Sequence, residues 1–194
     1  MKKIVLRALL GLSVGLATMP LSGCMPVVAG GFGVGVLMAE DRRTSGTYLL
    51  DEEIEIKAAS RIHENHGKNT HVSVTSHNRR VLLTGQAPDA ATRAKVEEIA
   101  KGVPNVREEV QNEVVIGGPT TFATRANDSY LTAKVKVRFL DNKQFNAHHV
   151  KVVTEAGTVF LMGLVKRAEG DAAAEITART GGVLKVVKVF EYMD

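Results

Sequence analysis

The sequence contains no tryptophan, and aromatic residues make up only 5% of its 194 residues. Its single cysteine, Cys24, excludes a disulfide bond within the chain. The formal net charge of +4 overstates the positive charge, because three of the 25 basic residues, Lys2, Lys3 and Arg7, lie in an N-terminal segment with the features of a cleaved leader. The remaining 22 basic residues face 21 acidic ones. A mature chain this close to neutral gives no charge-based support for nucleic-acid binding.

Side-chain combinations typical of enzymes and of metal sites are also missing. Four histidines are irregularly spaced without a cysteine nearby, and so fall short of a closed zinc site: His63, His66, His71 and His77. No nucleophile-elbow signature frames the serines. The paired glutamates at 97–98 and 108–109 favour solvated faces over an acid/base pair. We therefore expect no enzyme activity, no metal and no cofactor.

The first 24 residues follow the pattern of a bacterial secretory signal. A basic start precedes an apolar run at 4–19, which is too short and wrongly flanked for a stable membrane span. The tetrapeptide Leu21-Ser22-Gly23-Cys24 resembles a lipobox. That resemblance implies removal of the signal peptide 1–23 and attachment of acyl chains such as palmitate at Cys24. Two or more acyl chains make membrane attachment stable.

The residue after the cysteine is Met25 rather than the aspartate that commonly retains Gram-negative lipoproteins in the inner membrane. By this resemblance we expect an outer-membrane anchor, with the soluble part facing the periplasm. Residues 24–50 would then comprise the lipidated cysteine and a tether, which is Gly-rich and apolar before it becomes polar.

The rest of the chain consists of two similar copies of one sequence pattern. Residues 51–62 (DEEIEIKAASRI) align with 128–139 (DSYLTAKVKVRF) at an offset of 77, and 71–85 (HVSVTSHNRRVLLTG) align with 149–163 (HVKVVTEAGTVFLMG) at 78. The final segments, 106–114 and 183–191, return to the offset of 77. Two copies are too few for a repeat array, so this is a tandem duplication. It predicts a first domain at 51–116, a linker at 117–126 and a second domain at 127–194.

Each copy has the pattern helix, strand, strand, helix, strand. Apolar residues at every fourth position mark the first helix, and alternating residues around a polar turn mark a hairpin. A second helix and an alternating last strand follow, the latter at 106–114 in the first copy. The strand–helix–strand part should close right-handed with parallel strands. We predict an α+β fold of two tandem αββαβ sandwiches, each a three-stranded mixed sheet with two helices on one face. Units this small are marginal alone, so we expect packing between them.

This pattern, the glycine after the second strand, and the spacing of Val106, Val110 and Asn112 resemble the BON domain. Two such copies behind a lipobox, with DRRT before the first, NDSY opening the second and VFLMGLV within it, resemble the dual-BON-domain outer-membrane lipoproteins. The resemblance implies binding of anionic phospholipid through the second domain and support of outer-membrane integrity. The chain departs in having Tyr130 where some members carry tryptophan, and 183–190 lacks the asparagine of the first copy.

The first helices of the two copies differ on the side opposite the core. A wheel at about 100° per residue groups apolar side chains there in the second copy, at Tyr130, Ala133, Val137 and Leu140. Their counterparts in the first copy are Glu53, Ile56, Ser60 and His63. Lysines flank the apolar group at Lys134 and Lys136. The second copy, with ten basic and eight acidic residues, also carries more positive charge than the first, which has nine and eleven.

A helix that is apolar on two sides is covered on both, either by protein or by lipid. One alternative is that Tyr130, Val137 and Leu140 pack against the first domain. The other is that they lie on an anionic, phosphatidylglycerol-like membrane, with the lysines near lipid phosphates. The lysines and the family resemblance favour the membrane. Two further functions stay open, an adaptor that binds envelope assembly or division proteins and a structural spacer.

Overall fold

The computed structural model describes residues 41–67, 70–107 and 109–194, and the structure-based statements below concern these residues. Cys24, the signal peptide and residues 24–40 of the expected tether lie outside them. The described residues belong to one compact unit that contains both copies of the duplicated sequence.

Both copies form the predicted α+β sandwich. The first contains α3 (Ser45–His66), β1 (His71–His77), β2 (Arg80–Ala87), α4 (Ala90–Lys101), β3 (Val110–Asn112) and β4 (Val115–Ile116). The second contains α5 (Phe122–Asp141), a 3-10 turn η1 (Ala147–His149), β5 (Lys151–Glu155), β6 (Thr158–Val165), α6 (Arg167–Ala178) and β7 (Lys185–Tyr192). In each sheet the hairpin is antiparallel and the last strand runs parallel to the central one. The mixed sheets predicted from the sequence are confirmed.

Four element boundaries differ from the prediction. Helix α3 begins at Ser45, inside the expected tether, and α5 begins at Phe122, inside the expected linker. In the first copy the last strand comprises two short pieces, 110–112 and 115–116, although the Glu113 N–H between them still donates to the Leu83 carbonyl at 2.9 Å. In the second copy the 3-10 turn occupies His149, so β5 starts two residues after the expected strand start.

A buried aspartate in each first helix holds the hairpin of its own domain. In the second domain the Asp128 carboxylate accepts hydrogen bonds from the backbone N–H groups of Ala156 and Gly157, both at 2.8 Å. Asp51 does the same for Asn78 and Arg79, at 2.8 and 2.7 Å. All four turn residues have positive φ, as a two-residue type I′ hairpin requires. In each domain the carboxylate therefore satisfies both backbone donors of the turn. Of the four turn residues in the two domains, only Gly157 is a glycine.

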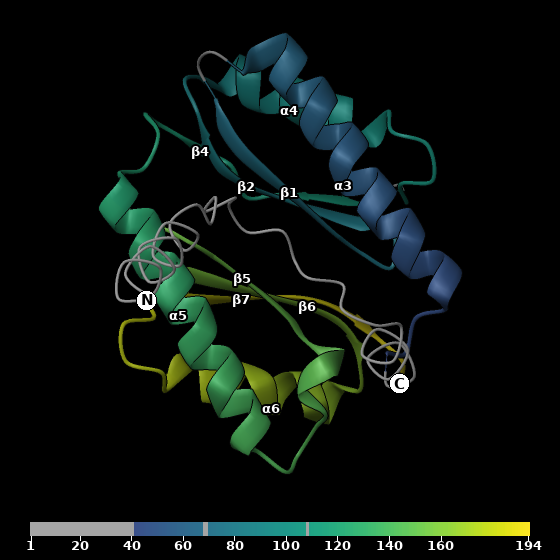
Figure 1. Ribbon diagram of the computed structural model, residues 1–194, viewed down its shortest axis with the longest axis vertical. Helices are drawn as coiled ribbons and strands as arrows, with labels where there is room; N and C mark the ends of the chain where they lie inside the picture. Colours follow the sequence, from purple (N-terminus) through teal and green to yellow (C-terminus); the bar gives the residue numbers. More distant parts are fainter. Residues whose placement is uncertain (1–40, 68–69, 108) are drawn as a thin grey trace, which may run out of the picture. The chain divides into compact units, whose positions relative to one another are not determined.

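The two domains pack through their sheets. Figure 1 shows the helices of each domain on the outer face of its sheet, while the other sheet faces meet in the middle. Along each central strand, successive side chains point alternately to the helices and to the other domain. In β6, Val159 and Leu161 join the core under the helices, while Phe160 and Met162 point the other way and pack with Leu82 of β2. The expected packing between the domains thus lies on the sheets.

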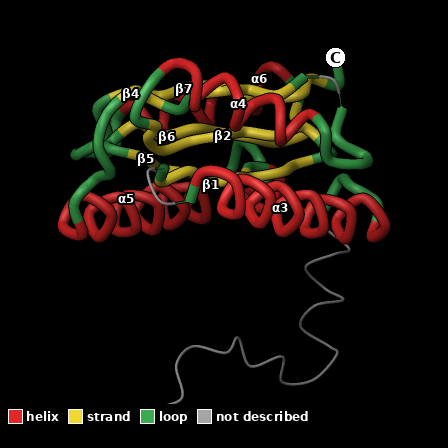
Figure 2. Tube along the Cα trace, turned by 90° about the horizontal axis from the view of Figure 1, so that it is seen from above, coloured by secondary structure: helices red, strands yellow, loops and turns green. Residues whose placement is uncertain are grey.

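Polar contacts border this apolar interface. Gln86 donates to Glu155 at 2.6 Å, and Arg80 Nη1 donates to the carbonyl of Phe190 at 3.0 Å. Lys151 Nζ lies 2.7 Å from Glu55 Oε1. Seen from above, the first helices α3 and α5 lie along the same edge of the unit (Figure 2).

We expect Asp128→Asn to lower the free energy of unfolding by about 1–3 kcal/mol, because one buried turn N–H loses its charged acceptor. Urea titration followed by circular dichroism measures this change. Asp141→Asn is the matched control, because Asp141 ends the same helix and is exposed. Equal urea midpoints for Asp128→Asn and the wild type would contradict the role assigned to this carboxylate.

Candidate functional site: an apolar stripe on helix α5

The outward side of α5 is apolar and exposed. Leu131, Val135 and Phe139 are buried in the core of the second domain. On the opposite side, Tyr130, Val137 and Leu140 are 63%, 56% and 66% exposed, and Ala133 is exposed between them.

The stripe is longer than the sequence reasoning recognised. Phe122, 79% exposed, and Ala126 continue it toward the helix N-terminus. At about 100° per residue all six side chains fall within about 80° of one another: Phe122, Ala126, Tyr130, Ala133, Val137 and Leu140. The first two were missed because 117–126 was expected to be a linker. The N-cap was the available signal, since Thr121 accepts from the Thr124 N–H just as Thr44, 77 residues earlier, accepts from Thr47.

The two predicted lysines flank the stripe in different ways. Lys134 Nζ donates to the Gly181 carbonyl at 2.9 Å and lies 5.8 Å from the centre of the Tyr130 ring. Lys136 is exposed on the other side of the stripe. The structure therefore brings the predicted residues together as one apolar surface with a positive charge on each side.

The equivalent face of α3 is interrupted by polar residues. The counterparts of the stripe at an offset of 77 are Ser45, Leu49, Glu53, Ile56, Ser60 and His63. Only Leu49 and Ile56 are apolar, at 64% and 68% exposed. Glu53 forms an ion pair with Lys57, the counterpart of Lys134. A continuous apolar stripe is thus a property of the second domain.

The alternative that Tyr130, Val137 and Leu140 pack against the first domain is wrong. These side chains are exposed, whereas the domains meet through their sheets. The first domain instead covers the helix-free face of the second sheet, where Phe160, Met162 and Val189 pack with Leu82.

A groove of about 460 Å³ lies at the C-terminal end of the stripe. Lys136 and Leu140 of α5 line it together with Arg43 and Tyr48 at the start of α3. His77 also lines it and is buried, and burial lowers its pKa to about 4, with a further contribution from the positive charge of Arg43. The beginning of the described chain therefore lies beside the end of α5.

Two neighbouring arginines, Arg42 and Arg43, bind residues 41–43 to both domains. Arg43 donates to Asp51 of the first domain at 2.7 Å. Arg42 makes a bidentate contact with Glu169 at the start of α6, at 2.6 and 2.8 Å, and donates to the Leu164 carbonyl. The hydrogen bonds from Arg42 lower the pKa of Glu169 to about 2. Residues 41–43 are therefore a clasp, and the sequence reasoning had assigned them to the tether.

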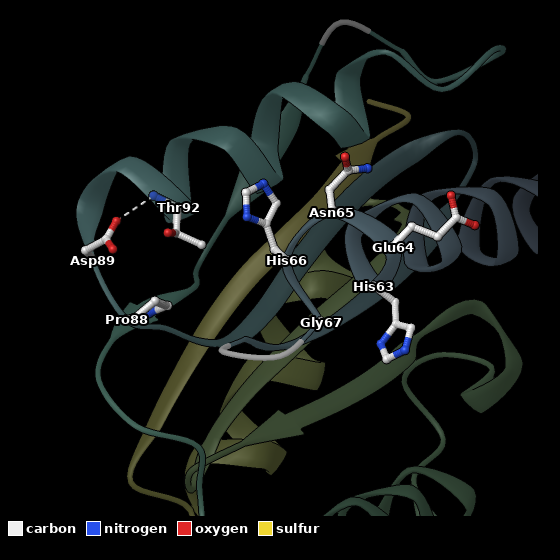
Figure 3. A pocket seen from close by; sticks show the side chains of 8 residues that line it. All are labelled: His63, Glu64, Asn65, His66, Gly67, Pro88, Asp89 and Thr92. Atoms are coloured by element: carbon white, nitrogen blue, oxygen red, sulfur yellow. Dashed lines mark hydrogen bonds between the residues drawn. The ribbon is translucent and has the colours of Figure 1, made fainter.

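A second hollow, of about 680 Å³, lies at the far end of α3 (Figure 3). His63 and His66 line it with Asp89, which caps α4 through the Thr92 N–H. Figure 3 shows the two imidazoles pointing in different directions. Within the described ranges, no three His, Cys, Asp or Glu side chains are grouped so that they could hold a metal ion.

Comparison with known proteins agrees with this architecture. A family model for the BON domain matches residues 50–118 and again 127–194. The chain belongs to the BON-domain family. It is 39% identical to the outer membrane lipoprotein DolP of Haemophilus influenzae over 92% of this chain and 93% of that protein.

Two other relatives are similar over most of their length. One is a 21 kDa hemolysin of Actinobacillus pleuropneumoniae, 35% identical over 79% of this chain and 80% of the relative. The other is the osmotically-inducible protein Y of Escherichia coli, 30% identical over 73% and 72%. In the described part of this BON protein, no helix is long and apolar enough to cross a bilayer.

Because of the ion pair between Arg42 and Glu169, we expect the free energy of unfolding to fall at acid pH. Glu169 has a lowered pKa in the folded state, so its ion pair with Arg42 stabilises fully above the ordinary value of 4.5 and is lost as pH falls through about 2. We expect wild type to be more stable than Glu169→Gln at pH 7, with the difference shrinking between pH 4.5 and 2. Urea titrations across this pH range measure it.

Glu175→Gln is the control for this experiment, because Glu175 forms an exposed ion pair with Arg179 on the same helix. Exposed pairs contribute little to stability. If the difference in free energy of unfolding between the wild type and Glu169→Gln stays constant from pH 7 to pH 2, the ion pair does not have the stabilising role described here.

Proposed function

We propose that this BON protein is a lipid-anchored protein of the outer membrane whose second domain binds anionic phospholipid through the outer face of α5. The observation that carries the proposal is the uninterrupted exposed stripe from Phe122 to Leu140 on a helix whose opposite side fills the core. Monomeric proteins rarely leave a contiguous apolar surface of this kind uncovered.

The charges around the stripe fit a membrane surface. An amphipathic helix that lies in the interface buries its apolar face among lipids and keeps basic side chains at the level of the phosphates. Lys134 and Lys136 occupy such positions on either side of the stripe. Each basic residue near an anionic surface contributes about 1 kcal/mol. Burial of a large apolar side chain contributes about 1.5–3 kcal/mol as an upper value.

The proposed anchor at Cys24 makes weak binding sufficient. Sixteen residues lie between Cys24 and Asp41, and a fully extended chain from one to the other spans at most about 60 Å. The clasp places Asp41 beside the groove at the end of α5. A domain confined this close to a bilayer is present at a high effective concentration, so α5 needs little affinity of its own.

The name of the Haemophilus influenzae relative supports the outer-membrane part of the proposal. With the soluble domains facing the periplasm, binding of anionic phospholipid would support the integrity of the envelope without catalysis. In a protein adaptor, by contrast, the same stripe would bind an envelope protein and would ignore lipid.

Co-sedimentation of residues 41–194 with liposomes tests the proposal. We expect binding to vesicles that contain phosphatidylglycerol and little binding to phosphatidylcholine alone. Val137→Glu should lower the partition coefficient at least ~10-fold, since a loss of about 1.4 kcal/mol already gives that factor. Binding should also weaken with salt, because the lysines contribute electrostatically.

Ser60→Glu is the matched control, since Ser60 holds the position of Val137 on α3. It should bind as the wild type does. Circular dichroism and urea midpoints establish that both variants are folded. A folded wild type that does not sediment with phosphatidylglycerol vesicles would refute lipid binding and favour the adaptor.

A further inference from the structure

The loop between α6 and β7 lies directly against α5, next to the stripe. Arg138 of α5 donates to the Arg179 carbonyl at 2.7 Å, and Lys134 donates to the Gly181 carbonyl at 2.9 Å. Gly182 has φ of 102°, and a Cβ added there would lie 2.7 Å from Leu131 of α5. The loop backbone is therefore held in close contact with the helix.

This loop presents Leu184, the most exposed large apolar side chain in the described part of the chain, at 81%. Its position is well defined, because the Leu184 N–H donates to the Gly157 carbonyl at 2.9 Å and its side chain lies over Gly157. Gly157 is in turn bound by Asp128 of α5. A fixed backbone thus displays leucine to solvent beside the stripe.

The first domain has the same loop geometry with a charged side chain at this place. Arg107, the counterpart of Leu184, donates its N–H to the Arg79 carbonyl, also at 2.9 Å. Arg61 donates to the Gly102 carbonyl as Arg138 does to Arg179. The backbone contacts are the same in both copies, but the side chains differ, because Arg107 Nη1 donates to Glu191 of the second domain at 2.7 Å, whereas Leu184 extends into solvent.

A second exchange between the domains lies on the first helix, at Tyr130. Glu53 pairs with Lys57 in the first domain, whereas Tyr130 lies under Lys134 in the second. Two exposed positions, one on α5 and one on the loop that Lys134 contacts at Gly181, are therefore charged in the first domain and apolar in the second.

We infer that Leu184 is a second point of membrane contact, which enters the lipid beside Tyr130 while α5 lies on the surface. This inference rests on the proposed function and extends the membrane-binding face from the helix to residues 181–185. The occupant is an anionic bilayer rather than a protein, because the loop carries the exposed Lys185 directly after Leu184 and is held at Gly181 by the Lys134 ammonium, so positive charge accompanies it. The apolar stripe of α5 continues the same surface.

The absence of tryptophan from the chain permits a direct test. Single-tryptophan variants of the whole processed chain, Leu184→Trp, Tyr130→Trp and Arg107→Trp, are reconstituted into vesicles of phosphatidylglycerol and phosphatidylcholine with brominated acyl chains. Tryptophan in contact with brominated chains loses fluorescence and shifts its emission to the blue. Tyr130→Trp reports on the proposed function, and Arg107→Trp is the matched control in the first domain.

We expect strong quenching and a blue shift for Leu184→Trp and Tyr130→Trp, and neither for Arg107→Trp. Quenching at 130 without quenching at 184 would overturn the inference and leave the proposed function intact. Quenching at neither position would overturn both. Equal quenching at all three positions would also overturn the inference, because contact would then not distinguish the domains.

Discussion

The sheet of the second domain is apolar on both faces, and its own helices can cover only one of them. The alternation along β6 sends Val159 and Leu161 to the helices and Phe160 and Met162 to the other side. Leu82 of β2 meets them there, so one domain covers the bare sheet face of the other. The remaining arrangement depends on this packing, because joining the sheets in the middle leaves the helices outermost. The outer side of α5 is therefore available for a partner.

The duplicated scaffold separates what holds the fold from what varies. In both domains an aspartate of the first helix binds the N–H groups of the hairpin turn, and an arginine of that helix binds the loop that follows the second helix. These contacts involve backbone groups, which every sequence supplies. Surface positions were free to diverge around them. In the second domain they are apolar beside Lys134, whose counterpart is Lys57, and Lys136, whose counterpart is Ala59, and this composition fits the proposed contact with anionic lipid.

Much of the fold followed from the sequence, because hydrophobic period and turn residues are local signals. The helical stripe containing Leu131, Val135 and Phe139 is buried as its spacing indicates. Helix starts were missed where no apolar period marks them, so Phe122 and Ala126 were assigned to a linker. Leu184 was missed for a different reason. In a linear pattern it is one more residue at the start of a strand, and its position beside α5 arises from contacts with Gly157 and Asp128.

The sequence by itself determined the duplication, the order of elements in each domain and the fact that α5 has two apolar sides. These are properties of residue spacing along one chain. Only the tertiary structure decided what covers each side. Periodicity identifies a face but not its neighbour, so packing against the first domain and contact with lipid were equally compatible with the pattern. The meeting of the sheets, the clasp of Arg42 on Glu169 and the loop beside Lys134 join residues that are far apart in sequence. Those contacts leave the stripe exposed, and no local pattern contains them.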